Sequence, residues 1–211
     1  MPRCDDTVET MTRELIKTAD DGTARCGWVS DDPQYQRYHD EEWGTPLHGY
    51  QALFETIALE GFQAGLSWIT ILHRRRAFRS AFDDFSISRV ARFDEVKTDE
   101  LARDPSIIRN RQKIMATIAN ARIIEELISD DPGALDRLVW SHVPTSHQRP
   151  ETIEQVLSVT TESTALSASL RRLGLKFVGP TTMHALMQAA GILNDHAVGC
   201  TRGDQLAPTR R

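Results

Sequence analysis

Two pairs of cysteine and histidine residues near opposite ends of the chain have the chemistry of a metal site. Cys26 and His39 stand near the start with twelve residues between them, and His196 and Cys200 stand near the end as H-x3-C. Thiolate and neutral imidazole are ligands that a tetrahedral zinc ion prefers. An isolated Cys or His is more often an ordinary core or surface residue, but the two pairs together predict one zinc ion that joins both ends of the globular region. Four protein ligands leave no open coordination position, so this zinc is expected to hold structure and not to activate water.

A group of aromatic residues and one acidic residue could form a binding pocket. The aromatic residues that concentrate in the first third of the chain are Trp28, Tyr35, Tyr38, Trp43 and Trp68. Each one alone is best explained as a core residue, but as a group they could stack on a planar base, including a cationic one. Glu60 lies between Leu59 and Phe62 at the end of an apolar helical pattern. It is either a residue of the helix surface or one held in a pocket, and the local sequence slightly favours the surface.

The segment 173–181 separates two helical stretches and contains Gly174 and Gly179. Two glycines five residues apart allow a tight turn whose backbone N–H groups point outward at the start of the second helix. Such N–H groups can bind a phosphate, and Pro180 and Thr181 begin that helix in the usual way. Any helical hairpin needs glycine, however, so the turn is equally compatible with a purely structural role.

The acidic charge of the chain is unusual for a protein that binds nucleic acid. The net charge is −5 over 211 residues, and 40% of the residues are hydrophobic, which is enough for the core of one domain. Basic residues cluster at 73–76, 109–113 and 171–176, but such a run is usually a solvated helix face. Composition alone therefore does not indicate DNA, although contact through backbone groups would reduce the need for a basic surface.

The remaining composition indicates a cytoplasmic protein. Three cysteines, an odd number, argue against a disulfide framework, and Cys4 is left as a spare thiol. No apolar run approaches the roughly 20 residues that span a bilayer, and the first residues lack the apolar segment of a secretory signal. We expect no membrane association, and association with the nucleoid if the source is bacterial.

The spacing of apolar residues predicts an all-α fold without strands. The predicted helices span residues 50–62, 66–78, 87–93, 105–127, 134–140, 163–173 and 181–190. Gly174 and Gly191 are expected to end the last two. The helical domain is expected to cover residues 25–200, with a mobile N-terminal extension at 1–24 and a flexible tail at 201–211.

Several motifs, taken in order, resemble the 3-methyladenine DNA glycosylase I family, a branch of the helix-hairpin-helix DNA glycosylases. They are RCGWV at 25–29, YHDEEWG at 38–44, LEGFQAGLSW at 59–68, FVG at 177–179 and NDHAVGC at 194–200. The resemblance covers the chain from about residue 25 to residue 200 and leaves out both tails. Several of these motifs are long and contain tryptophan, which makes coincidence an inadequate explanation.

This resemblance implies a helix-hairpin-helix glycosylase fold and a function in base-excision repair of alkylated double-stranded DNA. The zinc clip would consist of Cys26, His39, His196 and Cys200. In the implied reaction 3-methyladenine is flipped out of the duplex and its N-glycosidic bond is hydrolysed. In the implied base pocket, Glu60 and Tyr38 would hydrogen-bond the edge of the base, and Trp68 would stack on the base. The other implied pocket residues are Tyr35, Trp28 and Trp43. The implied DNA contacts are Gly174, Val178, Gly179 and Thr181.

Two departures from the wider superfamily refine the expectation. Thr181 stands where bifunctional relatives place a Schiff-base lysine, so a monofunctional enzyme without lyase activity is expected. The usual catalytic Asp beyond the hairpin lacks a clear counterpart, and Asp195 is at least as well suited to orienting its neighbour His196. We expect a monomer without an organic cofactor. The alternative is a non-enzymatic, zinc-stabilised protein that recognises bent or damaged DNA. In such a protein Glu60 and the aromatic residues would only be part of the hydrophobic core.

Overall fold

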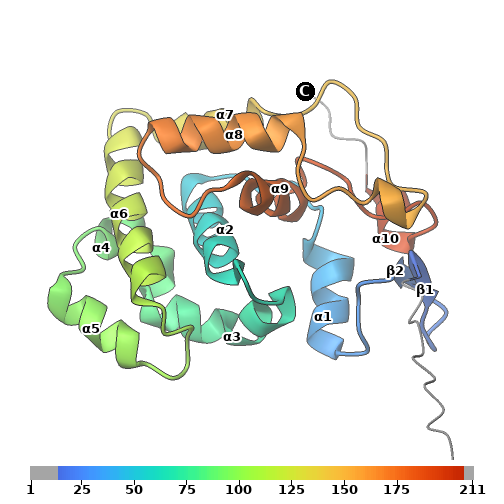
Figure 1. Ribbon diagram of the computed structural model, residues 1–211, viewed down its shortest axis with the longest axis horizontal. Coiled ribbons are helices and arrows are strands. Elements are labelled where there is room, and N and C mark those ends of the chain that lie inside the picture. Colours follow the sequence, from blue (N-terminus) through green and yellow to red (C-terminus); the bar gives the residue numbers. More distant parts are fainter. Residues whose placement is uncertain (1–13, 207–211) are drawn as a thin grey trace, which may run out of the picture.

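Helices make up most of the structure, a computed structural model that describes residues 14–206 (Figure 1). The helices are α1 (Pro33–Arg37), α2 (Tyr50–Gln63), α3 (Trp68–Ala81), α4 (Ile87–Val90), α5 (Glu95–Arg103), α6 (Arg111–Leu127), α7 (Ala134–Trp140), α8 (Thr161–Arg172), α9 (Pro180–Ala189) and α10 (Thr201–Gln205). A π-helical turn spans Tyr38–Glu42, and 3-10 turns span Asp83–Phe85 and Ile153–Gln155. The predicted helical fold is confirmed. Among residues 14–206 no helix is both long and apolar enough to cross a membrane.

Helix α2 forms the centre of the fold because other helices cover it on nearly every side. It packs against α3, α6, α7 and α9, and Figure 1 shows it in the middle of the molecule. Residues 57–62 of α2 are all buried, which is the pattern of a helix that is enclosed all round. The ring of Phe62 lies 4.7 Å from that of Phe78 and 5.9 Å from that of Phe82 within the apolar core. A polar residue in the run 57–62 is therefore buried as well, and Glu60 is such a residue.

All seven predicted helices are present, most of them with shifted boundaries, and side-chain caps explain two of the shifted starting points. The helix predicted from residue 105 begins at Arg111, since the Asn110 side chain accepts a hydrogen bond from the Lys113 N–H at 3.1 Å. The helix predicted from Ser163 begins at Thr161, because Thr160 is the cap and Ser163 is its partner in a capping box. Helix α7 covers the predicted residues 134–140.

Helix α5 was not predicted because it presents little apolar surface. Only Thr98 and Leu101 are buried among its residues, and Val96 is 76% exposed. Its start is fixed by Asp94, whose side chain accepts a hydrogen bond from the Lys97 N–H at 2.9 Å. A helix held by its cap and two buried side chains gives no clear 3.6-residue pattern.

Both ends of the described chain are more ordered than the sequence indicated. Strand β1 (Ile16–Thr18) pairs antiparallel with β2 (Ala24–Cys26), with Ile16 opposite Cys26, so an all-α description omits a short hairpin. The expected mobile extension 1–24 thus includes a strand, and its first thirteen residues, with Cys4, lie outside the described residues.

The expected flexible tail likewise contains α10, which is tied back onto the molecule. The Arg149 guanidinium contacts the Asp204 carboxylate at 2.6 Å, and the Ala24 N–H donates to Thr201 Oγ1 at 3.2 Å. These bonds place α10 beside β2, as Figure 1 shows. Residues 207–211 lie outside the described residues.

The turn between α8 and α9 is held by one buried amide side chain. Asn120 on α6 accepts a hydrogen bond from the Lys176 N–H at 2.8 Å and donates one to the Lys176 carbonyl at 3.0 Å. Gly174 has φ +97°, which favours glycine, but Gly179 has φ −66° and needs no such freedom. The second left-handed residue of the turn is Phe177, with φ +57°. The predicted two-glycine turn is therefore right for Gly174 and wrong for Gly179.

We expect Asn120→Ala to lower the free energy of unfolding by about 2–3 kcal/mol, because it leaves two backbone groups of the turn without partners. Urea denaturation would measure this change. Gln112→Ala, an exposed position on the same helix, is the matched control and should be neutral. An Asn120→Ala variant as stable as the parent would show that the turn does not depend on this side chain.

Candidate functional site

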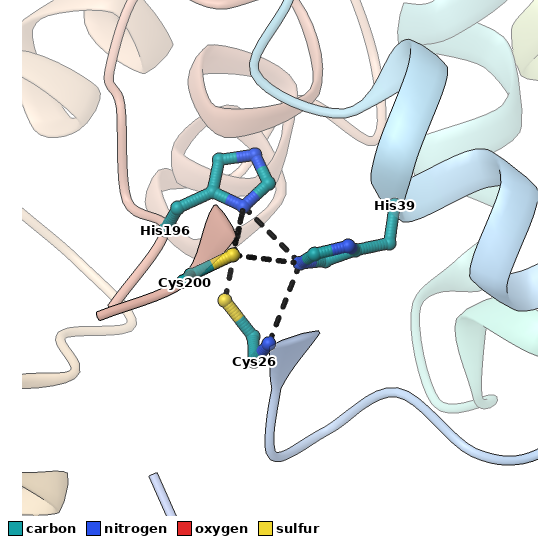
Figure 2. Close-up of side chains that lie close together, drawn as sticks. All are labelled: Cys26, His39, His196 and Cys200. Atoms are coloured by element: carbon teal, nitrogen blue, oxygen red, sulfur yellow. Dashed lines mark hydrogen bonds between the residues drawn. The ribbon is translucent and has the colours of Figure 1, made fainter. Parts of the chain in front are cut away.

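Four ligand atoms from the two ends of the described chain converge at one buried point (Figure 2). They are Sγ of Cys26, Nε2 of His39, Nδ1 of His196 and Sγ of Cys200, all within 4.8 Å of one another. His196 Nδ1 lies 3.1 Å from His39 Nε2, 3.4 Å from Cys200 Sγ and 3.8 Å from Cys26 Sγ. In a tetrahedral site with Zn–S near 2.3 Å and Zn–N near 2.0–2.1 Å, neighbouring ligand atoms are about 3.3–3.8 Å apart. The cluster therefore has the dimensions of a metal site.

The far sides of the two imidazole rings show which nitrogens carry protons. His39 Nδ1 lies 2.7 Å from Asp40 Oδ1, and His196 Nε2 lies 3.0 Å from the Trp43 carbonyl oxygen. Both oxygens accept only, so in neutral rings these outer nitrogens hold the protons. The two inner nitrogens are then facing lone pairs 3.1 Å apart, an arrangement that a cation would stabilise. The four residues could thus hold a metal ion.

The Asp40 carboxylate contacts the outer ring nitrogen of His39 and so orients one of the four residues of the cluster. The Arg25 guanidinium holds Asp40 in turn, with Nη2 2.7 Å and Nε 3.0 Å from its two oxygens. Asp195, which the sequence placed beside His196, makes its hydrogen bonds elsewhere, with Gln188 Nε2 at 2.7 Å and His147 Nε2 at 2.8 Å. The ligand-orienting carboxylate that sequence reasoning sought in Asp195 is therefore Asp40, acting on His39.

A cavity of ≈ 320 Å³ opens beside the cluster, and the residues that the sequence analysis selected for a pocket all line it. They are Trp28, Tyr35, Tyr38, Trp43, Glu60 and Trp68. Trp28 meets Trp43 edge to face at 4.9 Å between ring centroids, and Tyr38 lies 5.3 Å from Trp68. The size of the cavity and its aromatic walls suit a planar organic ligand.

Glu60 lies in the last turns of α2, and its side chain faces this cavity and not solvent. The residue is only 4% exposed, and burial raises the pKa of its carboxyl group to about 8. The surface position that the local sequence slightly favoured is therefore wrong. Sequence reasoning failed here because the covering of α2 on all sides is a tertiary property.

Three side chains on the cavity wall have buried polar atoms without a hydrogen-bond partner. They are Glu60 Oε2, Trp68 Nε1 and both ring nitrogens of His184. A native interior satisfies most of its buried polar atoms, so a group of exceptions around one cavity calls for an explanation. A ligand with its own donors and acceptors would satisfy them.

The profile of the methyladenine glycosylase family matches residues 28–203 of the chain. The chain belongs to this family. It is similar to DNA-3-methyladenine glycosylase 1 of Escherichia coli strain K12, with 46% identity over 178 residues that cover 83% of this chain and 95% of that protein.

Solved structures of methyladenine glycosylases share the fold. The structure of a 3-methyladenine DNA glycosylase I superposes with a TM-score of 0.80 at 42% identity and covers 84% of this chain and 98% of its own. A variant of 3-methyladenine DNA glycosylase I in complex with 3-methyladenine has a TM-score of 0.78 at 33% identity and covers 86% of this chain and 96% of its own. The helical glycosylase fold expected from the sequence is confirmed.

Four polar residues of the cavity in this glycosylase-family chain were missed by the sequence analysis. They are Gln63, Ser158, His184 and Gln188. His184 and Gln188 are four residues apart on α9 and so share one helix face, which is the only signal that the sequence held. Asp195 also lines the cavity, which sequence reasoning did not foresee.

The hairpin meets the cavity at the start of α9. Thr181, in the first turn of that helix, lines the cavity. Gly179 is the N-cap and provides no side-chain cap, so the first N–H groups of α9 are open to a ligand. Val178 as a whole residue is only 1% exposed, and its carbonyl accepts a hydrogen bond from Ser167 Oγ at 2.6 Å. Its part in any DNA contact of the hairpin would therefore be to pack the turn against the core.

We expect Glu60→Gln to stabilise the folded protein, and to do so more at pH 8 than at pH 5. The folded chain keeps the Glu60 proton up to a pH near its raised pKa of about 8, whereas an ordinary Glu loses it near 4.5. Between these values the unfolded chain binds fewer protons, so the free energy of unfolding of the parent falls as pH rises. Glu60→Gln avoids this loss of stability, which amounts to about 4 kcal/mol at pH 8 and to about 1 kcal/mol at pH 5.

Urea denaturation of parent and variant at the two pH values measures the difference. Glu55→Gln, on the same helix but in an ion pair with Arg79, is the matched control and should show no gain. An equal difference in stability at both pH values would mean that Glu60 is ionised in the folded protein.

Proposed function

We propose that the chain is a DNA-3-methyladenine glycosylase, which removes 3-methyladenine from alkylated double-stranded DNA and leaves an abasic site. The proposal is carried by the buried Glu60 carboxyl group, whose Oε2 has no partner inside a cavity walled by aromatic rings. It is supported by relatives that are named for this activity and by a structural neighbour in complex with 3-methyladenine.

Base selection in this proposal follows from the charge of the lesion. Methylation at N3 makes adenine in DNA a cation, and a cation beside Glu60 favours the ionised carboxylate that burial otherwise disfavours. The carboxylate then accepts a hydrogen bond from the exocyclic amine of the base. Trp68 stacks on the ring of the base, and Tyr38 contacts the same base edge as Glu60. Tyr35, Trp28 and Trp43 close the pocket. An undamaged adenine is neutral and gains no such attraction, so it is not selected.

The chemical step needs little help with the leaving group. The nucleotide is flipped out of the duplex at a cost of a few kcal/mol, which damage reduces by weakening base pairing. The cationic base leaves as a neutral molecule, so the protein need not protonate it. Water then adds to the electron-poor sugar carbon. Thr181, at the start of α9, offers no amine for a Schiff base, so the proposed enzyme is monofunctional and has no lyase activity.

One structural Zn²⁺ per chain is proposed to occupy the cluster of Cys26, His39, His196 and Cys200. The facing lone pairs of the two imidazoles and the tetrahedral dimensions of the cluster support this assignment. Four protein ligands close the site, so the bound ion would supply structure and no chemistry to the reaction.

We expect Cys200→Ser to lose the zinc and to unfold at a lower temperature, because the free energy of metal binding in such a site contributes directly to the stability of the folded protein. Metal analysis of the purified protein and thermal denaturation with and without a chelator would measure both effects. Cys4→Ser, which changes the one cysteine outside the cluster, is the control and should keep metal and stability. Purified parent protein without zinc would rule out the clip.

The hairpin is proposed to hold the DNA backbone through Gly174, Val178, Gly179 and Thr181. Among residues 14–206 the structure shows no ion pair for the basic side chains beside it, which are Arg171, Arg172 and Lys176. Other basic side chains, such as Arg25 and Arg75, are neutralised by carboxylates. The net charge of −5 therefore describes the whole chain and not this surface.

We expect Gly179→Ala to weaken binding to duplex DNA while leaving the binding of free 3-methyladenine unchanged, because a methyl group would crowd the approach of a phosphate to α9. The new Cβ would lie 3.5 Å from Arg171 Nη2, an ordinary contact, so the variant should fold normally. Gly174→Ala is the contrasting variant, because a residue with φ +97° is strained by any side chain and should lose stability. Unchanged affinity for DNA in Gly179→Ala would exclude this docking.

We expect the parent to release free 3-methyladenine from methylated DNA, and Glu60→Gln to do so at least about tenfold more slowly, since a charge-assisted hydrogen bond is worth about 1.5–3 kcal/mol. Chromatography of the released bases in single-turnover reactions would measure the rates. Glu55→Gln should retain the parental rate. A parent that binds methylated DNA but releases no base would be a non-enzymatic damage-recognition protein, the alternative left open by the sequence.

A further inference from the structure

The cavity has two chemically different walls. One wall consists of the aromatic rings and Glu60 and faces the base in the proposed function. The other comes from the C-terminal part of the chain and carries a polar group of residues, with Thr181, His184 and Gln188 on α9 and Asp195 after it. The base-recognition scheme uses the first wall only and leaves the second without a role.

His184 is the most unusual residue of this polar wall. It is only 3% exposed, and neither ring nitrogen has a hydrogen-bond partner. Nε2 lies 3.4 Å from Asp195 Oδ2, too poorly placed for a hydrogen bond but within reach of one after a small movement. An imidazole that only filled space in the core would be costly, because Nδ1 is desolvated without a partner and Nε2 has only the Asp195 carboxylate at 3.4 Å.

Asp195 is fixed in place, so that it can orient the His184 ring. Gln188 Nε2 donates to Oδ2 at 2.7 Å, and His147 Nε2 lies 2.8 Å from Oδ1. The carboxylate is thus held from two sides, by α9 and by the segment that precedes α8. If His184 Nε2–H turns toward Asp195, the other ring nitrogen, Nδ1, is left as a free lone pair.

We propose that His184, oriented by Asp195, binds the attacking water and removes its proton when the glycosidic bond is hydrolysed. This inference rests on the proposed function. A phosphate held at the start of α9 places the attached sugar near the first turns of that helix, where Thr181 and His184 line the cavity. The base then occupies the aromatic wall, and the sugar carbon lies between the two walls, next to His184.

The proposed step is balanced in atoms and electrons. The bond between the sugar C1′ and the base nitrogen breaks, and its electron pair leaves with the base, which becomes neutral. The water oxygen forms a bond to C1′, and its proton passes to the unprotonated nitrogen of His184. Hydrogen bonds of this kind are often long before substrate binds and shorten in the reacting complex, which agrees with the 3.4 Å separation of His184 and Asp195.

The competing explanation is that His184 hydrogen-bonds the base and so contributes to its recognition. The two roles differ in what they change. Loss of a base-reading residue weakens binding of free 3-methyladenine, whereas loss of a water-activating residue lowers the rate of cleavage and leaves that binding intact.

The test compares His184→Ala and His184→Gln with the parent in single-turnover release of 3-methyladenine from methylated DNA. We expect both variants to be about 100-fold slower, at the lower end of the usual effect of a general base, because the leaving group is already activated. Binding of free 3-methyladenine, followed by tryptophan fluorescence, should be unchanged. Added imidazole should enter the space left in His184→Ala and restore part of the rate.

The control for a merely structural loss is Met183→Ala, which removes a fully buried side chain on the same helix that does not line the cavity. It should lose stability, and imidazole should not change its rate. The proposal is wrong if both His184 variants cleave at the parental rate, if free 3-methyladenine binds more weakly in proportion to the lost rate, or if imidazole fails to accelerate folded His184→Ala. In each of these cases the parent still releases the base, whereas a parent without any release overturns the proposed function itself.

Discussion

The substrate cavity depends on the contact between the two ends of the chain at the Cys and His cluster. Trp28 follows Cys26 by two residues, and Tyr38 directly precedes His39, so the ligands fix the backbone on which the aromatic wall stands. On the other side, Asp195 directly precedes His196. The segment 27–37 has one short helix, α1, without a buried residue, and it is tied to α3 by few contacts, such as the hydrogen bond from Gln34 Nε2 to the Leu72 carbonyl. The cluster supplies the rigidity that helical packing provides elsewhere in the fold.

Glu60 shows how function and stability oppose each other in this fold. Burial in α2 raises the pKa of its carboxyl group, so in the absence of ligand the group is kept neutral at some cost in stability. The same burial makes the site responsive to charge, since only a cation restores the ionised form. In the proposed function, selectivity for a charged base over a neutral one therefore depends on a residue that the folded chain alone would be more stable without.

Sequence reasoning was successful where local chemistry determines the outcome. The Cys and His cluster, which could hold a metal ion, was found because Cys and His are rare and their pairs stand at opposite ends, and α7 was predicted because its apolar spacing is regular. It failed where the outcome depends on distant parts of the chain. The burial of Glu60 follows from helices that cover α2, α5 lacks an apolar stripe, and strand β1 exists because it pairs with β2. His184 gave almost no signal, because a histidine on a helix is common and its unpartnered nitrogens are visible only in three dimensions.

The sequence distance between the two halves of the cluster has a consequence for how the protein is made. Cys26 leaves the ribosome long before Cys200, so the contact that fixes the aromatic wall cannot form until the chain has been made as far as Cys200. Contacts between such distant residues form late because a long loop must close first. During synthesis the tryptophans and tyrosines of the N-terminal segment are therefore exposed and need protection from aggregation. It also follows that a nascent chain that has not yet reached Cys200 lacks one of the four residues of the cluster.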